Sequence, residues 1–403
     1  MMAKNEDGLA KTWKEIVSSF LKLGVMSYGG PAIMGIMQTE LHEKRQWVTK
    51  DRFVEGLSLV NTLPGAGATQ LAIFLGYARG GWWGGLLGGL CFVLPAFFIM
   101  LALTIGYSAL GATPIMRGAL YGLGPVVLAI FLVAVYRLGK GAVRTVAQAL
   151  IAVGAATAAA FTSIGIAGIL LLAGGVGLLL FHSRKAGTTA LLAVAVVLAW
   201  LHLTSWSALA PAALHSAPVS RDLQEVAIFF FEVGALTFGG GLSMIAFIQE
   251  QVVNQFHWLT ANEFIDGLAL GQLTPGPILM LAAYVGYKVA GVAGAAVGAA
   301  AIFLPSFILM LSILPLFDRV RKLVWTKAAL KGIGPAVIGA LTVSLFQLAP
   351  HALHDVFATI VFVASVVALL VWHTGAIKLM IGGSILGVLR SRLTSVFGAS
   401  AAL

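Results

Sequence analysis

The chain has 403 residues, of which 59% are hydrophobic and only 10% are charged. With a mean hydropathy of +0.97, this composition excludes a soluble globular domain and predicts an all-α polytopic membrane protein embedded in the lipid bilayer. The formal net charge of +10 at pH 7 is spread over short connections between apolar runs, which argues against a nucleic-acid partner.

The first fifteen residues are polar, so we expect no cleavable signal peptide and a cytoplasmic N-terminal segment over 1–15. Thirteen apolar runs follow, each about long enough to cross the hydrocarbon core, and they predict a multi-pass protein of the cell inner (plasma) membrane. The runs are 16–37, 53–78, 82–110, 118–136, 145–161, 164–181, 188–205, 226–247, 264–287, 291–315, 330–349, 356–372 and 376–390.

Basic residues mark the cytoplasmic side by the positive-inside rule. Three connections carry clusters of Lys and Arg and should face the cytoplasm, whereas 206–221 and 350–355 hold only Arg221 and should face outward. The clusters are Arg137, Lys140 and Arg144; Arg184 and Lys185; and Arg319, Arg321, Lys322, Lys327 and Lys331.

The sequence repeats itself with an offset of 210 or 211 residues. This duplication predicts a first transport repeat at 16–140 and a second at 222–350. A linker at 141–221, with about three transmembrane helices, joins them, and C-terminal transmembrane helices follow at 351–403. Matched elements include segment 20–30 with 230–240, Trp47 with Trp258, Pro64-Gly65 with Pro275-Gly276, Leu94-Pro95 with Leu304-Pro305, and Gly122 to Pro125 with Gly332 to Pro335.

Seven apolar runs separate the starts of the two copies, and an odd number gives them opposite orientations in the bilayer. Inverted-topology repeats are typical of secondary transporters, because equivalent halves can open one site alternately to each side. Full spanning would place the basic connection 38–52 outside and its counterpart 249–263 inside, against the charge rule. Broken or re-entrant helices at the start of each copy remove this conflict, and we favour them, although full spanning stays open.

Glycine and proline interrupt the apolar runs at Gly-Gly-Pro (29–31), at its counterpart 239–241 and at the two Pro-Gly elements. A helix that restarts after a break presents free N–H groups and a positive dipole end, which suit an anion. Close helix packing is the alternative, and we expect it for the glycines within 80–89 and 286–298. The predicted substrate-binding residues are Ser27, Tyr28, Gly29, Gly30, Pro31, Asn61, Thr62, Pro64, Gly65, Gly67, Thr69, Gln70, Thr237, Phe238, Gly239, Gly240, Gly241, Gln272, Thr274, Pro275, Gly276 and Pro277.

One ordered set of motifs recurs in both copies: the glycine-rich breaks, Trp47 and Trp258, the Pro-Gly elements, and the Leu-Pro pairs that end at Pro95 and Pro305. This set resembles the chromate ion transporter family, in its two-domain, long-chain type, over about 16–140 and 226–350. The resemblance implies a chemiosmotic transporter that exports chromate, an oxyanion shaped and charged like sulfate, and so confers chromate resistance.

The sequence departs from the family pattern in two places. Ala66 follows Pro64-Gly65 where a second proline is usual, and no histidine follows Gly-Gly-Pro. A proton-coupling histidine is therefore not carried over, and sulfate or a related oxyanion stays an alternative substrate. Glu55 and Asp266 occupy equivalent positions before the two Pro-Gly elements and are the predicted coupling residues, with local pairing at the membrane interface as the alternative.

No Walker loop and no hydrolase-like arrangement of His, Ser and Asp is evident, so we expect a transporter and not an enzyme. No cofactor is expected, and no metal, because His351, His354 and Asp355 have no further strong ligand nearby. A passive anion channel of the same architecture stays open. The expected partners are chromate or a sulfate-like oxyanion, protons and the bilayer, and a homodimer is left open.

Overall fold

The computed structural model describes residues 6–26, 31–60, 63–110, 113–162, 164, 166–208, 223–237, 243–316 and 324–400. Every regular element in this part of the chain is a helix, and no strand occurs in it. The predicted all-α polytopic membrane fold is therefore confirmed.

The helices fall into two series that follow the duplicated sequence. The first comprises α1 (Glu6–Met26), α2 (Pro31–Met37), the π-helix η1 (Gln38–Lys44), α3 (Lys50–Val60), α4 (Gly67–Leu110), α5 (Pro114–Ala142), α6 (Val146–Phe161), α7 (Ile166–Phe181) and α8 (Arg184–Ala208). The second comprises α9 (Leu223–Ala235), α10 (Ser243–Gln249), the π-helix η3 (Glu250–Gln255), α11 (Ala261–Leu273), the 3-10 helix η4 (Ile278–Met280), α12 (Leu281–Ile313), the 3-10 helix η5 (Leu314–Leu316), α14 (Val324–Ala352), α15 (Val356–Leu370) and α16 (Ala376–Ser400).

Four helices of the described residues are long and apolar enough to cross a membrane. A helix of about 20 residues spans the hydrocarbon core of roughly 30 Å. Three shorter apolar helices, α6, α7 and α15, accompany them. The four long candidates are Gly67–Leu110, Ile115–Ala142, Ile278–Ile313 and Ala328–Ala352.

Helices α4 and α12 are each two helices joined by a sharp turn. The backbone leaves helical geometry at Gly80-Gly81 and at the equivalent Ala290-Gly291, where the second residue of each pair has a positive φ of 63° or 62°. The expected close packing of glycines is also present, because a Cβ on Gly76 or on Gly286 would collide with the carbonyl oxygen of the glycine eight residues later. Each turn thus folds a short helical segment back onto a long one.

The short segment 67–79 also packs antiparallel to α3. The Cα of Gly56 lies against the ring of Phe74, and Val60 lies beside Gly67 at the break between the two helices. The second copy repeats the arrangement with Gly267 against the ring of Tyr284. Because α3 and 67–79 are only about 16 and 20 Å long, each hairpin is too short to cross the hydrocarbon core twice.

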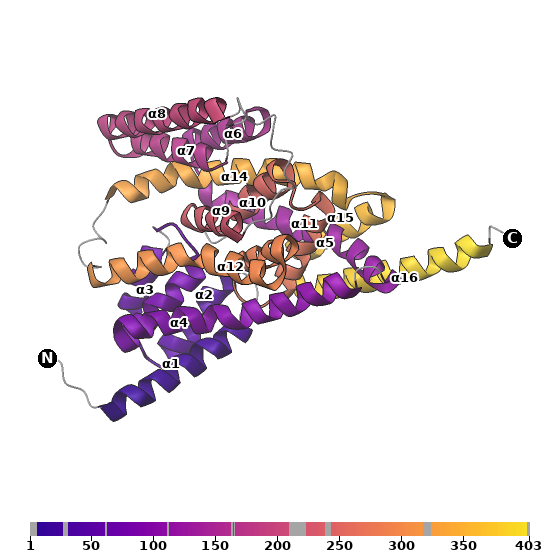
Figure 1. The fold of residues 1–403 in the computed structure, drawn as a ribbon, viewed down its shortest axis with the longest axis horizontal. Helices are drawn as coiled ribbons and strands as arrows, with labels where there is room; N and C mark the ends of the chain where they lie inside the picture. The colour runs from indigo at the N-terminus through magenta and orange to yellow at the C-terminus, as the bar shows by residue number, and fades with distance from the viewer. Residues whose placement is uncertain are drawn as a thin grey trace.

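Each series packs its last helices against the other series. α5 of the first series packs against α15 and α16, whereas its equivalent α14 packs against α6 and α7. In Figure 1, α14 lies beneath α6, α7 and α8, and α16 runs alongside α5 toward the C-terminus. Glycines allow both contacts, since a Cβ on Gly122 would strike the carbonyl of Gly383, and one on Gly332 that of Ala173. Each copy therefore depends on the other for part of its packing.

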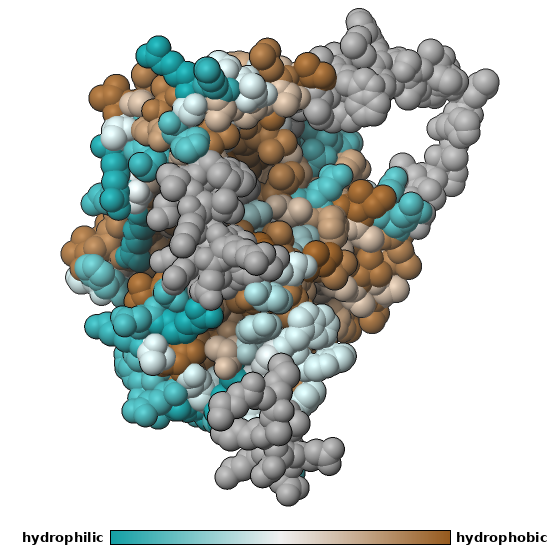
Figure 2. Space-filling view, turned by 90° about the vertical axis from the view of Figure 1, so that its left-hand side faces the viewer, coloured by the Kyte–Doolittle hydropathy of each residue, from teal (hydrophilic) through white to brown (hydrophobic). Residues whose placement is uncertain are grey.

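Equivalent helices also expose equivalent apolar stripes. In α6 the stripe consists of Val146, Leu150 and Val153. In α15 it consists of the equivalent residues Val356, Ile360 and Val363, and all six side chains are at least half exposed. Stripes of this kind suit contact with lipid, since water does not favour large exposed apolar surfaces. Seen from the left-hand end of Figure 1, hydrophilic residues gather mainly along the left and lower part of the surface, with hydrophobic residues over much of the rest (Figure 2).

Candidate functional site

The first Pro-Gly element packs on the second copy. The N–H of Gly65 donates to the carbonyl of Thr237 at 2.6 Å, and the N–H of Ala66 donates to the Ser306 hydroxyl at 2.7 Å. Gly65 has a φ of 127°, and a Cβ there would collide with the side chains of Gln70 and Ser306. A glycine is therefore required at this crossing point.

The second Pro-Gly element packs in the same way on the first copy. Gly276 has a φ of 97°, and a Cβ there would lie 2.8 Å from that of Ala96, the residue equivalent to Ser306. Thr274 ends α11, and its hydroxyl lies 2.8 Å from the carbonyl oxygen of Leu270 and 3.4 Å from the sulfur of Met100. The two elements thus cross reciprocally between copies. Two hydrogen bonds from backbone N–H groups join the copies at the first crossing, and the contacts of Gly276 with Ala96 and of Thr274 with Met100 join them at the second.

Two polar side chains lie fully buried at the start of α4. Thr69 and Gln70 are both 0% exposed, and the Thr69 hydroxyl and the Gln70 carbonyl oxygen have no hydrogen-bond partner among the described residues. The Gln70 amide nitrogen donates to the carbonyl of Pro64 at 2.6 Å. Because buried polar atoms normally have partners, these groups mark a place at a helix start where a polar ligand can bind.

The two predicted coupling carboxylates have different surroundings. Asp266 accepts a 2.9 Å hydrogen bond from the hydroxyl of Tyr107, which belongs to the first copy. Glu55 lies 3.1 Å from Arg52 one turn away, and its side chain is 35% exposed. The local pairing considered from the sequence thus applies to Glu55, while Asp266 lies between the copies.

Asp266 lines a cavity of about 510 Å³ that lies between α4, α5, α11, α12 and the end of α14. We call it the Asp266 cavity, and its polar and charged lining includes Tyr107, Arg117, Asp266, Lys288, His351 and His354. Lys288 is paired with Glu263 at 2.7 Å. The cavity therefore brings basic and acidic groups from both copies together.

An ion-pair cluster holds the start of the first copy together. Glu15 accepts hydrogen bonds from the Trp47 indole at 2.9 Å and from Arg79 at 2.8 Å, and Arg45 lies 3.9 Å from it. Arg45 also contacts Glu40, which pairs in addition with Lys44 and Lys22. The hydrogen bond from Lys44 is the main reason that the pKa of Glu40 lies below its ordinary value. This cluster links α1, η1 and the turn in α4.

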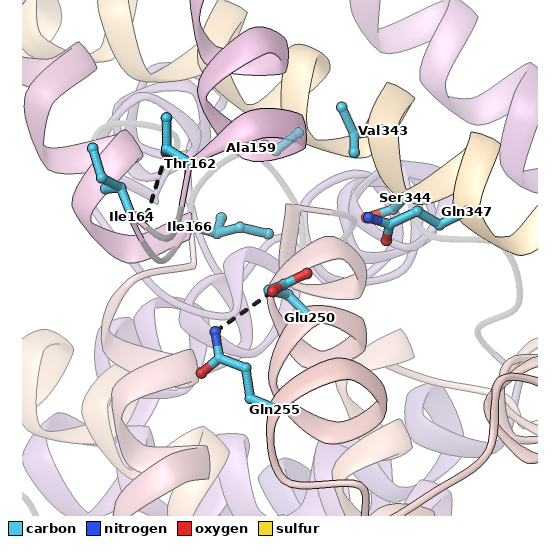
Figure 3. A pocket seen from close by; sticks show the side chains of 10 residues that line it. Ala159, Thr162, Ile164, Ile166, Glu250, Gln255, Val343, Ser344 and Gln347 are labelled. Carbon is cyan, nitrogen blue, oxygen red and sulfur yellow. Dashed lines mark hydrogen bonds between the residues drawn. The ribbon is translucent and has the colours of Figure 1, made fainter. Parts of the chain in front are cut away.

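The second copy has amides where the first has basic side chains. Glu250, equivalent to Glu40, accepts hydrogen bonds from Asn254 at 2.8 Å and from Gln255 at 3.5 Å. It lines a cavity of about 180 Å³, in which Glu250 and Gln255 face Ser344 and Gln347 of α14 (Figure 3). The duplicated framework thus carries different charges in its two halves.

Several predicted site residues are placed and others are not described. The first crossing, beside Thr237, contains Pro64, Gly65, Gly67, Thr69 and Gln70. The second contains Thr274 to Pro277, and Gln272 lies just before it near the end of α11. Pro31 begins α2. Ser27, Tyr28, Gly29, Gly30, Asn61, Thr62, Phe238, Gly239, Gly240 and Gly241 lie outside the described residues.

Sequence reasoning missed Ser306, Tyr107 and Arg117. Ser306 directly follows Pro305, and its alignment with Ala96 is the only signal that could have marked it. Tyr107 and Arg117 lie in apolar sequence without a matching motif, and only tertiary packing brings them to Asp266. Among the described residues, no group of three His, Cys, Asp or Glu side chains lies close enough to hold a metal ion.

Comparison with known proteins gives consistent results. The chain is 32% identical over 388 residues to a chromate transport protein of Cupriavidus metallidurans, covering 93% of this chain and 92% of the relative. It is 34% identical to a probable chromate transport protein of Synechococcus elongatus, over 86% of this chain and 87% of the relative. It is 33% identical to a chromate transport protein of Pseudomonas aeruginosa, over 84% and 81%. No solved structure matches significantly.

The family model described as chromate transporter matches this chain twice, at residues 14–180 and 224–388. The first match extends beyond α5 to include α6 and α7. The second extends beyond α14 to include α15 and about half of α16. The two matches thus contain equivalent sets of helices, and together they cover most of the chain. The chain belongs to the chromate transporter family.

Proposed function

We propose that this protein is a secondary active transporter that exports chromate from the cytoplasm, draws on the proton gradient and confers chromate resistance. Three relatives that align over most of this chain carry chromate transport in their names. The duplicated helices with breaks in both copies fit the alternating-access design of secondary transporters. We place the protein in the cell inner membrane with its N-terminus in the cytoplasm.

The buried hydroxyl of Thr69 is the observation that most directly supports an anion site. It lies in the first turn of a helix that begins at Gly67, where backbone N–H groups and the helix dipole favour a negative charge. The Gln70 amide nitrogen carries a second N–H beside the one that it donates to Pro64. An oxyanion bound here would give the Thr69 hydroxyl the partner that it lacks among the described residues.

The reciprocal crossing of the Pro-Gly elements supports a mechanism for alternating access. Gly65 contacts the second copy through Thr237, and Gly276 contacts the first copy through Ala96. A shift of one copy against the other therefore changes the surroundings of both elements at once. The whole predicted set from Ser27 to Gln70 and from Thr237 to Pro277 remains our proposed substrate site, with the transport repeats at 16–140 and 222–350.

We propose further that the hairpins of α3 with 67–79 and of α11 with the start of α12 are re-entrant and inverted relative to each other. Cysteine labelling tests this, because the chain's single cysteine, Cys91, is buried and can be replaced. Cysteines at the equivalent positions 51 and 262 should react with an impermeant reagent from opposite sides of the membrane, position 51 from the cytoplasm. Labelling of both from one side contradicts the inversion, and labelling of position 51 from outside supports full spanning.

Flux measurements in proteoliposomes test the transport mechanism. A pH gradient imposed at zero membrane potential should drive chromate against its own gradient, and the sign that does so shows how protons and anion are coupled. A passive anion channel of the same architecture would equilibrate chromate under every gradient. Sulfate as competing substrate separates a chromate transporter from a general oxyanion transporter.

Mutation tests the site and the coupling residues. Replacing Pro275, Gly276 and Pro277 together by alanine should abolish chromate resistance while the protein still inserts into the membrane. Wild-type resistance in that variant would remove the second Pro-Gly element from the site. Asp266→Asn should abolish the proton dependence of flux, whereas Glu55→Gln should weaken it less, because Glu55 is half-exposed and paired with Arg52.

A further inference from the structure

The Asp266 cavity lies beside the proposed substrate site but is distinct from it. α4 and α11 run antiparallel here, with Met100 against Thr274 at one level and Tyr107 against Asp266 at the next. The two levels are separated by two turns, or about 11 Å. The cavity therefore adjoins the second Pro-Gly element along one pair of helices, one from each copy.

The size and lining of the cavity suit a hydrated inorganic ion. Its volume is about 510 Å³, and a water molecule occupies roughly 30 Å³ of liquid. Donors come from several directions, since Arg117 and Tyr121 lie on α5, Asn262 on α11 and Lys288 on α12. A guanidinium with ammonium, amide and hydroxyl donors around it suits the oxygens of a tetrahedral anion.

The net charge of the cavity depends on protons. The ion pair of Lys288 with Glu263 is neutral, and Arg117, which has no ion-pair partner among the described residues, balances an ionised Asp266. The cavity is therefore neutral when Asp266 is ionised and both histidines are uncharged. Protonation of Asp266 adds one positive charge.

The other groups around Asp266 and the histidines leave this balance unchanged. Tyr107 and Tyr284 contact each other beside Asp266, and Tyr121 stacks with His354. Asp355 and Arg390, next to Tyr121, form an ion pair with each other. Asp266 therefore controls the charge that an anion meets.

We propose that the Asp266 cavity is a second anion-binding site, which takes up a tetrahedral dianion together with protons. Chromate and sulfate share this shape and charge, so the cavity suits both. That the anion is chromate rests on the proposed function. Ionised Asp266 repels a dianion, so loss of the protons releases it. Protons and anion thus bind cooperatively at this second site, whereas export driven by an inward proton gradient requires them to bind in alternation at the substrate site.

Calorimetric titration of the detergent-solubilised full chain with potassium sulfate, whose anion remains a dianion at every pH used, tests the proposal. If one proton accompanies each anion, linkage requires the dissociation constant to fall about tenfold per unit decrease in pH. Between pH 8 and pH 6 we expect one pH-dependent site in addition to any site at the Pro-Gly elements. Binding that is independent of pH over this interval overturns the proposal.

Three variants locate the site. Arg117→Gln should remove the pH-dependent site, and because Arg117 is exposed the change should leave the melting temperature unchanged. Asp266→Asn should raise the affinity at pH 8 and reduce its pH dependence. Arg144→Gln, which removes an arginine whose side chain donates to the carbonyl of Gly141 and lies outside the cavity lining, is the matched control and should bind as wild type.

The outcomes separate this inference from the proposed function. Unchanged binding in Arg117→Gln and in a His351→Gln/His354→Gln double variant overturns the second site, even where chromate flux is intact. A pH-dependent sulfate site that needs Arg117 supports it, even where proteoliposomes show no chromate export and the proposed function fails.

Discussion

The hydroxyl of Ser306 accepts a 2.7 Å hydrogen bond from the backbone N–H of Ala66, 240 positions earlier in the chain. Ser306 is fully buried. In the reciprocal crossing its counterpart Ala96 has no hydroxyl, and its methyl group is the nearest atom to a Cβ built at Gly276. Together with the hydrogen bond from Gly65 to Thr237, the Ser306 contact joins the two copies where the first Pro-Gly element turns into α4.

Ser306→Ala should weaken this junction. The change leaves the buried N–H of Ala66 without its acceptor, which costs about 1–3 kcal/mol, and we expect a lower melting temperature in detergent together with reduced chromate flux. Ser306→Thr keeps the hydroxyl and should retain most of the stability. Ser365→Ala, at a buried serine of α15 away from the crossings, is the control. An unchanged melting temperature in Ser306→Ala would show that Ala66 finds another acceptor.

Thr69 and Thr104 form a matched pair for testing the anion site. Both are threonines of α4 with 0% exposure, but the Thr104 hydroxyl donates to the carbonyl of Met100 at 2.7 Å, whereas that of Thr69 has no partner in the described structure. Thr69→Val removes a buried unpaired hydroxyl, so the fold should be as stable or more stable.

The same Thr69→Val change should raise the chromate concentration for half-maximal flux about tenfold, because a hydrogen bond to a charged ligand is worth about 1.5–3 kcal/mol. Thr104→Val should leave that concentration unchanged. Equal flux parameters in wild type and Thr69→Val would exclude the hydroxyl from substrate binding.

The sequence contained enough information to predict the helix breaks and the positions of the turns inside α4 and α12, because the apolar runs end at 78 and 287 and restart at 82 and 291. Proline next to glycine has few explanations within an apolar run, so Pro64-Gly65 and Pro275-Gly276 could be identified as breaks. The turn at Gly80-Gly81 lies in a stretch with many glycines that also pack closely. Its counterpart begins with Ala290, and there the sequence gave the end of the run but not the folding of the short segment back onto the long one.

The Asp266 cavity could not be predicted, for a different reason. Its charged lining comes from α4, α5, α11, α12 and α14, and no two of these elements are joined by a motif that fixes their distance. The exchange of α15 and α16 onto α5 is equally hidden, because the glycines that permit it, such as Gly122 and Gly383, are as common in other membrane helices. Tertiary packing supplies this part of the site.

Asp355 gives a pH-dependent contribution to stability at the start of α15. Its carboxylate accepts the N–H of Ala358 at 2.8 Å and pairs with Arg390. The backbone hydrogen bond is the main reason that the pKa of Asp355 lies below its ordinary value. Because the folded state has the lower pKa, this contribution is complete above the unfolded-state pKa of about 3.9 and is lost as the pH falls through the folded-state value.

Asp355→Ala should therefore lower the melting temperature at pH 7, since loss of an N-cap costs about 1 kcal/mol. The difference from wild type should shrink as the pH falls below about 4, where the wild-type carboxylate takes up a proton. Asp355→Asn keeps a cap but loses the ion pair, so we expect a smaller effect. A difference between wild type and Asp355→Ala that is constant from pH 7 to acid would contradict the role of the charge.

The helical hairpin of α12 depends on glycine where its two arms touch. A Cβ on Gly286 would collide with the carbonyl oxygen of Gly294, and one on Gly294 with that of Gly286. Neither backbone can move away freely, because α12 also packs against α9 and α4. Gly286→Ala should therefore cost about 1–3 kcal/mol, as overpacking of a close contact does, and lower both the melting temperature and the yield of folded protein.

Gly154→Ala in α6 is the control for that change. No atom lies within 4 Å of a Cβ built at Gly154, and replacing a helical glycine by alanine favours the helix by roughly 0.5–1 kcal/mol. Thermal unfolding in detergent should therefore rank Gly154→Ala at or above wild type and Gly286→Ala below it. If the two variants melt within about a degree of each other, the arms of the hairpin are not in the contact that the structure assigns to them, because a real collision at Gly286 cannot be as harmless as an open position on α6.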